Sequence, residues 1–487
     1  MKKILIALTF VSILHSFLQG QTSSDALRYS RLFLVGTARS EGVAGAFGAI
    51  GADFSVLATN PSGLGLYQKS EISITPLVHW AYTKSIYNGY SATDQKTNFA
   101  FGNFGFIFTV KPYKNRNKGI QNINIAFGMN RLNDFNNRMY MYGPNHTSSM
   151  LTSFINELNA TSGITPSMIE ERYPFDVALA YNAELIYYDS INGRYTCDMP
   201  NGGVSQGKAV TTFGSMNEFD LSFAANYNNR LYFGFTIGIP YIRYYESSRY
   251  EEWDSGDTIP YFQSSIYDYN LESHGTGINF KAGLIFRPLN WLRIGAAIHT
   301  PTWFGNMRDN WSTSLYAYYD SVLHDNSQYS PLGTYDYRMT TPFRAIGSFS
   351  VMFATFGLFS FDYEYVDYSQ ARFNSSLDSY TDINSEIRNS YKSWGNIRVG
   401  TEWKVADFRI RGGFAYFSNP YKYTGPNSER FQFGGGFGYR GKYFFADITY
   451  TWSKMNEEYF FYDPSLLNPS LNTIYSQAVI STIGFRF

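Results

Sequence analysis

Hydrophobic and polar residues alternate with a period of two through most of this chain. In the segment 231–239, one face carries only Leu, Phe and Ile, and the other carries Tyr, Gly and Thr. Successive side chains of a β-strand point to opposite faces, so this pattern predicts a strand with one apolar and one mixed face. The final segment, 479–487, shows the same pattern and ends on Phe487. The sequence therefore predicts an all-β fold.

Short links divide the alternating region into fourteen predicted strands. The links at 228–230, 287–291, 353–355, 404–407 and 440–442, and a longer one at 111–119, predict the periplasmic turns of a barrel. Bacterial outer-membrane barrels close with an even number of antiparallel strands, so fourteen is an acceptable count. The predicted strands are roughly 71–84, 97–110, 121–133, 211–228, 230–246, 270–287, 291–304, 335–352, 355–368, 391–404, 407–418, 430–440, 442–456 and 475–487.

This count requires residues 136–208 to form one long external loop. Apolar residues repeat at helical spacing over 150–158 and again over 175–186, and Thr165 followed by Pro166 is typical of a helix start. Two interpretations of these amphipathic helices remain open. They form either an apolar landing site for a ligand or a cap over the barrel mouth.

The composition also favours a membrane barrel. Aromatic residues make up 19% of the chain and charged residues only 16%, yet no apolar run of about 18 residues follows the N-terminal segment. Strands that face lipid would account for the aromatic rings. Lys2 and Lys3 precede an apolar run, and Gly20 offers a cleavage site, so residues 1–20 read as a secretory signal peptide. We therefore expect the protein in contact with lipid in the outer membrane of a Gram-negative type of bacterium.

The net charge and the predicted closed barrel indicate which partners the chain does not need. Its 39 basic and 39 acidic side chains cancel, which leaves no electrostatic footprint for nucleic acid. A closed barrel has no unpaired sheet edge, so we expect a monomer.

Residues 21–70 do not alternate and cannot belong to the barrel wall 71–487. Glycines recur at every third position, with alanines between them, which predicts tight backbone packing inside a narrow lumen. Neither spacing of a phosphate-binding glycine loop is present. This segment therefore predicts a plug. The glycines to which we assign hatch packing are Gly42, Gly45, Gly48 and Gly51.

Within this plug, the segments 36–40, 45–49 and 60–64, together with Asp53, resemble the N-terminal hatch of the FadL/TodX family. That family consists of outer-membrane channels for long-chain fatty acids and aromatic hydrocarbons. Its hatch carries an Asn-Pro-Ala turn where this chain has Asn60-Pro61-Ser62. Ser62 departs from the family pattern but is also small, so a tight turn remains compatible. The layout of signal, hatch, fourteen strands and terminal Phe extends the resemblance to the whole chain.

The resemblance implies passive uptake of a hydrophobic molecule. The molecule is caught at the external loops, held in an inner pocket and released sideways through the wall, at a kink in the third strand. In this chain a bulge near Gly128, Met129, Asn130 and Arg131 would provide that lateral gate, because Leu132 breaks the alternation. Alternatively, Arg131 simply lies at the external membrane interface.

Six residues are candidates for ligand binding. The turn Asn60, Pro61 and Ser62 offers polar contacts, and the inward-facing Arg398, Arg409 and Arg411 lie on two adjacent strands. A guanidinium can hold a fatty-acid carboxylate through charge-assisted hydrogen bonds. The competing interpretation is that these cations pair with inward carboxylates and with the plug.

Nothing in the sequence points to catalysis, a metal or a cofactor. The histidines after residue 20 are scattered without metal-ligand spacing, and no nucleophile lies in an identifiable motif. Two other classes of function stay open. One is a surface adhesin or porin-like structural barrel. The other, which is the stronger rival, is that the chain serves protein secretion machinery as a shuttle or adaptor, as some barrels that resemble this family do. In that case the external loops would bind a protein instead of a lipid.

Overall fold

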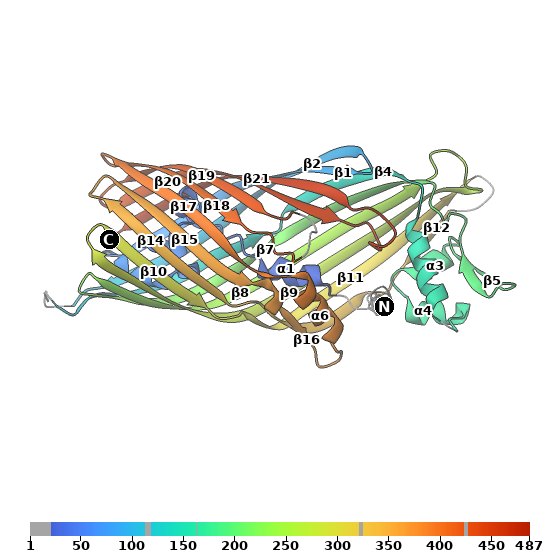
Figure 1. Ribbon diagram of the computed structural model, residues 1–487, viewed down its shortest axis with the longest axis horizontal. Coiled ribbons are helices and arrows are strands. Elements are labelled where there is room, and N and C mark those ends of the chain that lie inside the picture. Colours follow the sequence, from blue (N-terminus) through green and yellow to red (C-terminus); the bar gives the residue numbers. More distant parts are fainter. Residues whose placement is uncertain (1–20, 113–117, 162, 321–324, 423–426) are drawn as a thin grey trace, which may run out of the picture.

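The computed structural model describes residues 21–112, 118–161, 163–320, 325–422 and 427–487. The predicted signal peptide, 1–20, lies outside the described residues. The described strands form one long cylinder, with helical segments inside it and at one of its ends (Figure 1).

The cylinder is a single sheet of nineteen strand segments, and a separate hairpin projects from one end. The strands of the sheet are β1 (Glu71–Tyr87), β2 (Tyr90–Val110), β3 (Ile120–Asp134), β4 (Asn137–Asn145), β7 (Val204–Tyr227), β8 (Leu231–Trp253), β9 (Phe262–Leu289), β10 (Leu292–His299), β11 (Trp303–Tyr319), β12 (Asn326–Tyr329), β13 (Gly333–Thr340), β14 (Arg344–Phe353), β15 (Gly357–Asp367), β16 (Arg372–Asn374), β17 (Ser393–Val405), β18 (Phe408–Phe417), β19 (Arg430–Arg440), β20 (Phe444–Tyr459) and β21 (Ser470–Arg486). The hairpin is β5 (Tyr187–Asp189) and β6 (Arg194–Thr196).

Five of the nineteen segments only prolong the wall, so the barrel has fourteen strands. Across short breaks, β4 continues β3, β11 continues β10, β13 precedes β14 and β16 follows β15, while β12 pairs with the far end of β11. The barrel closes because β1 pairs antiparallel with β21 from Glu71↔Arg486 to Ile86↔Leu471. The predicted fold class, a closed barrel of fourteen antiparallel strands, is confirmed.

One end of the cylinder carries short turns and the other carries long loops. We call these the turn end and the loop end. The short turns of the described residues fall close to the predicted links; the β7–β8 turn, for example, contains Asn228 and Asn229, both at positive φ. Asn tolerates that left-handed conformation better than most residues, which explains its place in a tight hairpin turn. Most of the predicted link 111–119 lies outside the described residues.

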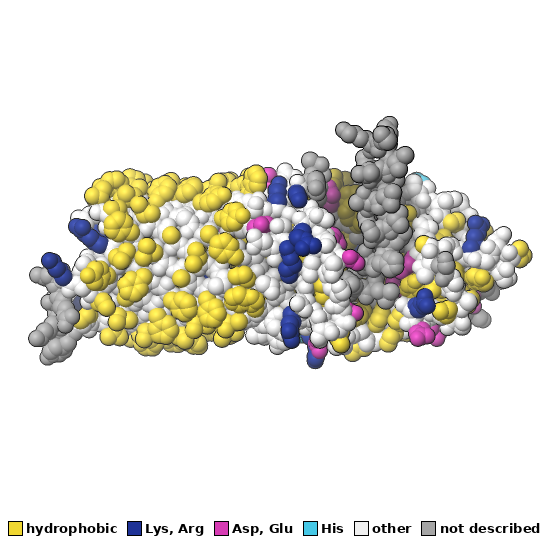
Figure 2. Space-filling model, turned by 60° about the horizontal axis from the view of Figure 1, so that its bottom comes forward, with side chains coloured by type: hydrophobic (Ala, Val, Ile, Leu, Met, Phe, Trp, Pro, Cys, Tyr) yellow, Lys and Arg dark blue, Asp and Glu magenta, His cyan; other side chains and the backbone are white. Residues whose placement is uncertain are grey.

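An apolar belt surrounds the cylinder toward its turn end. Figure 2 shows hydrophobic side chains covering this part of the outer surface, followed by a largely uncharged polar zone and then Lys and Arg side chains nearer the loop end. The belt consists of the outward residues of the predicted alternation, such as Phe233, Phe235 and Ile239, which are 40–46% exposed. Such a belt fits the hydrocarbon layer of a membrane. Within the described residues, no helix is both long and apolar enough to cross a bilayer.

The lumen is filled by residues 21–67, which we call the hatch. It contains α1 (Ser23–Ser30), α2 (Ala38–Gly42) and the 3₁₀ helices η1 (Phe54–Ala58) and η2 (Pro61–Leu66), and α1 lies inside the cylinder in Figure 1. Each of these helices begins after a residue whose side chain accepts a backbone N–H of the first turn. Those caps, Thr22, Thr37, Asp53 and Asn60, explain why a glycine-rich segment folds into short helices.

The long loop is shorter than predicted. Residues 137–145 of β4 pair with residues 204–212 of β7, so the excursion covers 146–203 and not 136–208. The wall strands simply continue past the apolar belt with an inward apolar face, including Met139 and Met141, which is why the sequence pattern looked like loop.

The excursion itself folds into a cap at the loop end. It contains α3 (Met150–Ala160), η3 (Pro166–Met168), α4 (Ile169–Arg172) and α5 (Val177–Asn182). The first predicted helix matches α3, whereas the second, 175–186, is shortened to α5. Cap residues such as Leu151 and Leu179 join one buried cluster with the wall residue Tyr250 and with Phe461, which lies between β20 and β21. This packing supports the interpretation of the helices as a cap over the barrel mouth.

Two further helical segments lie near the loop end. They are η4 (Tyr368–Gln370), which follows β15, and α6 (Thr381–Ser390), which packs beside α1 of the hatch. Ser23 of α1 donates a hydrogen bond to Glu386 of α6. These contacts hold the N-terminal end of the hatch to the loops.

Candidate ligand cavity and wall seam

The lower hatch, residues 36–67, lies against glycines of the wall. A Cβ at Gly413 of β18 would lie 2.2 Å from the carbonyl carbon of Val43, and Gly400 and Gly434 on the neighbouring strands meet Val43 and Glu41 in the same way. These three wall positions leave room for hatch backbone where any other residue would place a side chain. The hatch and the wall are therefore fitted to each other residue by residue.

The four predicted packing glycines all lie in the lower hatch. A Cβ at Gly48 would lie 2.1 Å from the Ser348 hydroxyl, and one at Gly42 would lie 3.1 Å from Thr449. Gly45 and Gly51 have φ of +76° and +70°, a region that residues with a side chain rarely adopt. At these positions the structure thus leaves either little space or an unusual backbone conformation.

Asn60, Pro61 and Ser62 form a turn that anchors the hatch. The Asn60 amide donates to the carbonyl of Gly48 at 2.6 Å, and its oxygen accepts from the backbone N–H and the hydroxyl of Ser62. Gly234 and Gly283 of the wall make room for this turn. Asn60 and Ser62 are fully buried and none of the three residues lines the cavity described below, so their geometry is that of a structural anchor.

Two of the three predicted arginines belong to buried ion clusters. Arg411 donates to Glu402 at 2.6 Å and to Asp447 at 2.7 Å, and Arg398 pairs with Glu364. A further pair joins Arg39 of the hatch to Glu402, at 3.0 Å. These contacts follow the competing interpretation of the sequence, in which inward charges pair with one another and with the plug.

The third arginine, Arg409, lies at the turn end of β18. It donates hydrogen bonds to the carbonyls of Ala406 and Phe408. None of the three predicted arginines lines the cavity. A ligand in that cavity therefore meets other residues.

A cavity of about 430 Å³ lies on the loop-end side of the lower hatch. It lies between the upper hatch, residues 21–35, and the inner faces of β1, β4, β7, β8, β19, β20 and β21. Its volume is in the range of small-molecule sites, roughly 300–1,000 Å³. The apolar part of its lining includes Leu27, Phe33, Val35, Leu77, Phe135, Met139, Val210, Met455, Ile474 and Ile480.

Two arginines of this lining have no carboxylate partner. Arg31 donates to the carbonyl of Ser428 at 2.5 Å, and Arg430 donates weakly to Gln432 at 3.4 Å. Within the described residues, neither guanidinium has a carboxylate oxygen at ion-pairing distance, and Nε of Arg430 is buried without a hydrogen-bond partner. Both cations rest against the ring of Phe33, at 5.1 and 4.1 Å from its centroid.

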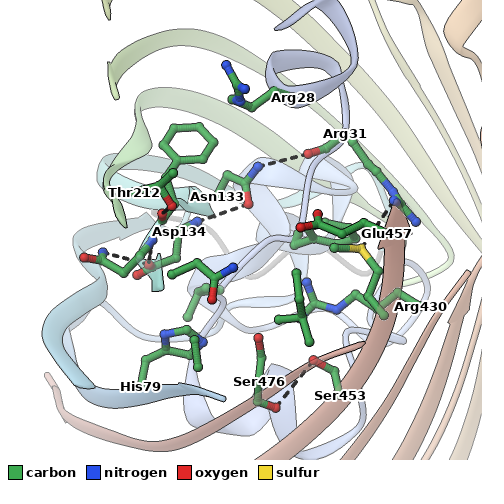
Figure 3. Close-up of a pocket in the computed structure, with 18 of the residues that line it drawn as sticks. Arg28, Arg31, His79, Asn133, Asp134, Thr212, Arg430, Ser453, Glu457 and Ser476 are labelled. Atoms are coloured by element: carbon green, nitrogen blue, oxygen red, sulfur yellow. Dashed lines mark hydrogen bonds between the residues drawn. The ribbon is translucent and has the colours of Figure 1, made fainter. Parts of the chain in front are cut away.

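The other charged groups of the lining are partly engaged. Glu41 accepts hydrogen bonds from Gly36 N–H and from Gln432, and Arg28 pairs with Asp25. Figure 3 draws Arg31, Glu457 and Arg430 on one side of the cavity, with His79 and Asp134 on the other. Glu457 thus lies on the same side of the cavity as Arg31 and Arg430. Its Oε1 has no hydrogen-bond partner.

Next to this cavity, the barrel wall is incomplete. β2 pairs with β1 from Tyr90 onward, but it pairs with β3 only over Asn103–Val110. Beyond that point β4 pairs with β7 and, in the described part of the chain, not with β2. We call this stretch the wall seam. It is bridged by side chains, such as Arg138 to Asp94 at 3.4 Å, instead of by a continuous backbone ladder.

The hatch occupies the start of the seam. Val35 N–H donates to the carbonyl of Arg131 at 2.9 Å, and Phe33 N–H donates to that of Leu132 at 3.1 Å. On the other side, a Cβ at Gly102 of β2 would lie 3.2 Å from the carbonyl oxygen of Gly36. Hatch backbone therefore takes part of the place that β2 vacates beside β3.

The predicted gate residues lie at the start of this seam. Gly128, Met129 and Asn130 still pair with β2, and the register of β3 against β7 shifts between Arg131 and Asn133. A second shift, between β1 and β2, occurs at Thr75/Pro76, opposite Asn103. Arg131 does not face lipid freely: it pairs with Asp134 and donates to the carbonyl of Phe101.

Sequence reasoning missed Arg31, Phe33 and Arg430. Arg430 opens an alternating strand, and it could have been grouped with the other inward arginines. Arg31 lies in a segment without periodicity, so no pattern assigned its direction. Only the fold brings these two residues from opposite ends of the chain to one ring.

Comparison with known proteins supports this architecture. No family model and no curated protein matches the sequence. Among solved structures, a FadL homologue of Pseudomonas aeruginosa matches with a TM-score of 0.55 at 12% identity, covering 94% of this chain and 100% of that chain. The Pseudomonas putida toluene transporter TodX matches with a TM-score of 0.52 at 11% identity, covering 93% and 98%.

A third structure, the monoaromatic hydrocarbon channel CymD, has a TM-score of 0.51 at 13% identity and covers 94% of this chain and 99% of that chain. At sequence identities this low, the similarity shows a shared fold and nothing more. The resemblance inferred from the hatch motif is thus confirmed at the level of architecture: this chain has the fold of the FadL/TodX channels.

Proposed function

We propose that the protein is an outer-membrane channel for the passive uptake of hydrophobic small molecules that carry an anionic end, such as long-chain fatty acids. The observation that carries this proposal is the cavity beside the upper hatch, where an apolar lining meets the guanidiniums of Arg31 and Arg430, which have no carboxylate at ion-pairing distance within the described residues. No cofactor or catalytic step is needed for such uptake.

The two parts of the lining suit the two parts of an amphiphile. Each CH₂ group that moves from water to the apolar lining contributes about 0.8 kcal/mol. A carboxylate between the two guanidiniums would form charge-assisted hydrogen bonds and supply the missing counter-charge. A neutral aromatic hydrocarbon would use the apolar lining but leave both cations unpaired, so the geometry favours the fatty-acid side of the proposal.

Release would occur sideways through the wall seam. The cavity is lined by residues 133–137, where β3 passes into β4, and by Val35, which bonds to Arg131 at the start of the seam. If the upper hatch withdraws from Arg131 and Leu132, the remaining closure consists of side chains. The bulge region from Gly128 to Arg131 then acts as the edge of a lateral gate.

The filled lumen supports uptake more than the secretion alternative. A shuttle or adaptor for secreted proteins would use flat external surfaces, and it needs no cavity with two arginines that lack a carboxylate partner. The cap at the loop end instead packs its apolar side chains into the barrel mouth.

The test compares two ligands with the same chain and different ends. Palmitate and hexadecanol are titrated into the purified protein by calorimetry. The variants are Arg430→Gln, Arg31→Gln and, as a control outside the cavity, Arg409→Gln. A charge-assisted hydrogen bond is worth roughly 1.5–3 kcal/mol, so each cavity variant should lose about tenfold or more in palmitate affinity. Hexadecanol binding should change little.

Two results would overturn the proposal. One is equal affinity for the acid and the alcohol, and the other is an equal loss in Arg409→Gln. Glu457→Gln supplies an opposite prediction: removal of the competing carboxylate should tighten palmitate binding. In cells, a deletion strain should grow poorly on oleate and should export its secreted proteins normally.

A further inference from the structure

A second hollow lies on the outer surface of the barrel, away from the ligand cavity. It has a volume of about 560 Å³ and is formed by β8, β9, β11, β13 and the residues that follow β16. Its lining includes Tyr241, His274, Thr276, Gly305, Asn306, Arg308, Asp336, Arg338, Ser375 and Ser376.

The hollow exists because β11 is irregular. Its register shifts between Phe304 and Met307 against β13, and between Phe304 and Arg308 against β9. Gly305 lies at this shift, and a Cβ there would have no atom within 4 Å. The Asn306 side chain accepts the backbone N–H of Thr276, which stabilises the displaced backbone.

The lining is polar and partly cationic. Arg308 donates two hydrogen bonds to Asp336, at 2.6 and 2.8 Å, and both side chains are more than half exposed. Arg338 is also exposed, and within the described residues no carboxylate lies at ion-pairing distance from it. His274 contacts Glu272 and the Tyr241 hydroxyl. The rings of Tyr241 and His274 thus line the same hollow as the two arginines.

The hollow begins directly where the apolar belt ends. The outward residues Ile239, Ile278 and Trp303 are 41–45% exposed, and each lies two positions from a lining residue, Tyr241, Thr276 or Gly305. Figure 2 shows Lys and Arg side chains on the outer face at this side of the belt. Trp and Tyr at such a border mark the level of lipid headgroups.

We propose that this hollow binds the phosphorylated sugar headgroup of a glycolipid in the leaflet at the loop end. Arg308 and Arg338 would bind a phosphate, because planar guanidiniums match its oxygen geometry. Asp336, Ser375 and Ser376 would bind sugar hydroxyls, and Tyr241 offers a ring face with a polar tip. The site is distinct from the transport cavity. The proposal rests only on the predicted orientation, in which the turns face the periplasm and the loop end faces outward.

The test measures binding of bisphosphorylated lipid A to the purified barrel in detergent. The test variants are the double variant Arg308→Gln/Arg338→Gln and, with all charges kept, Gly305→Leu, which fills the hollow. The matched control is Arg249→Gln, because Arg249 forms a similar exposed pair with Asp268 but does not line the hollow. The double variant and Gly305→Leu should each bind at least tenfold more weakly, and the control should stay within twofold.

Three results would overturn the proposal. They are unchanged binding in the double variant, an equal loss in Arg249→Gln, or equal binding of lipid A from which both phosphates have been removed. Vesicles of phosphatidylglycerol provide a further arm: equally tight, arginine-dependent binding there would show that any anionic lipid suffices. Palmitate binding in the lumen should be the same in all these variants, which separates this test from that of the proposed function.

Discussion

The upper and lower halves of the hatch are held in different ways. The lower hatch, 36–67, fits its backbone against wall glycines and ties Arg39 into a buried ion cluster. The upper hatch, 21–35, borders a cavity and completes a seam through two backbone hydrogen bonds. The lower half meets the wall backbone to backbone, whereas the upper half meets it mainly through side chains, such as Tyr29, which is buried against the wall residues Phe135 and Tyr244. The withdrawal proposed for release concerns the stretch of the upper hatch, 33–35, that bonds to Arg131 and Leu132.

The largest expected effect concerns a buried ion cluster of the wall that touches both halves of the hatch, at Ser30 and at Gly45. Glu364 is the carboxylate that faces both Arg344 and Arg398, all three being largely buried. Glu364→Gln leaves two guanidiniums without a counter-charge, which should lower the free energy of unfolding by about 3–5 kcal/mol. Denaturant unfolding, followed by gel mobility, measures this. Asp268→Asn, which breaks an exposed pair, should cost less than about 1 kcal/mol; equal losses would contradict our distinction.

The next effect concerns the fit between hatch and wall. Gly413→Leu places a side chain where Val43 backbone lies, and overpacking of this kind typically costs about 1–3 kcal/mol. The adjacent Gly412 has no atom within 4 Å of an added Cβ, so Gly412→Leu is the matched control. Thermal unfolding of both variants should show a loss for Gly413 alone. A similar loss of thermal stability in both variants would mean that the strand propensity of the new residue, and not its clash with the hatch, sets the stability.

A cross-link tests the proposed withdrawal of the upper hatch directly. Cysteines at Val35 and Arg131 would join the upper hatch to β3, where their backbones already pair. Oxidation should reduce palmitate uptake by about tenfold, and a reductant should restore it. Cysteines at Ala38 and Thr482 would lock the lower hatch, where Ala38 N–H donates to Thr482. If this second cross-link blocks uptake as strongly, the lower hatch moves as well.

The smallest effect concerns a helix cap. Thr22 caps α1 in a capping box with Asp25, and loss of such a cap costs about 0.5–2 kcal/mol. Thr22→Ala should therefore speed hydrogen exchange in residues 23–30 without changing the unfolding midpoint of the barrel. Thr37→Ala, the matching change in the lower hatch, should shift that midpoint, because Thr37 also bonds to Asp53. If Thr22→Ala shifts the unfolding midpoint and Thr37→Ala does not, the upper hatch and not the lower hatch contributes to the stability of the barrel.

The barrel could be predicted from the sequence because its side chains alternate regularly between two environments. Alternation along strands such as β8 follows from one face meeting lipid and the other the lumen, and a single chain shows it. The extent of the loop end was missed, because β4 lies beyond the lipid and needs no outward apolar residue. Its inward methionines, Met139 and Met141, form only a short pattern that resembles a loop with scattered apolar positions.

The candidate site was harder to predict for a different reason. Arg398 and Arg411 are as inward and as cationic as Arg430, and only their three-dimensional neighbours separate paired from unpaired cations. Asn60 was proposed to contact a ligand, yet its amide is used within the hatch. A local motif specifies a turn, but it does not specify which way the turn faces. The bulge near Leu132 was easier to predict, because Leu132 interrupts the alternation of apolar and polar residues in the sequence.

The wall glycines have a consequence for how the protein is assembled. Gly400, Gly413 and Gly434 lie on three consecutive strands, and hatch backbone takes the place of the side chains that these strands lack. A cylinder that closed first would carry a groove on its inner surface and would have to admit a folded insert through its end. We therefore expect the insert to be in position while β17, β18 and β19 associate, so that it acts as a template during membrane insertion.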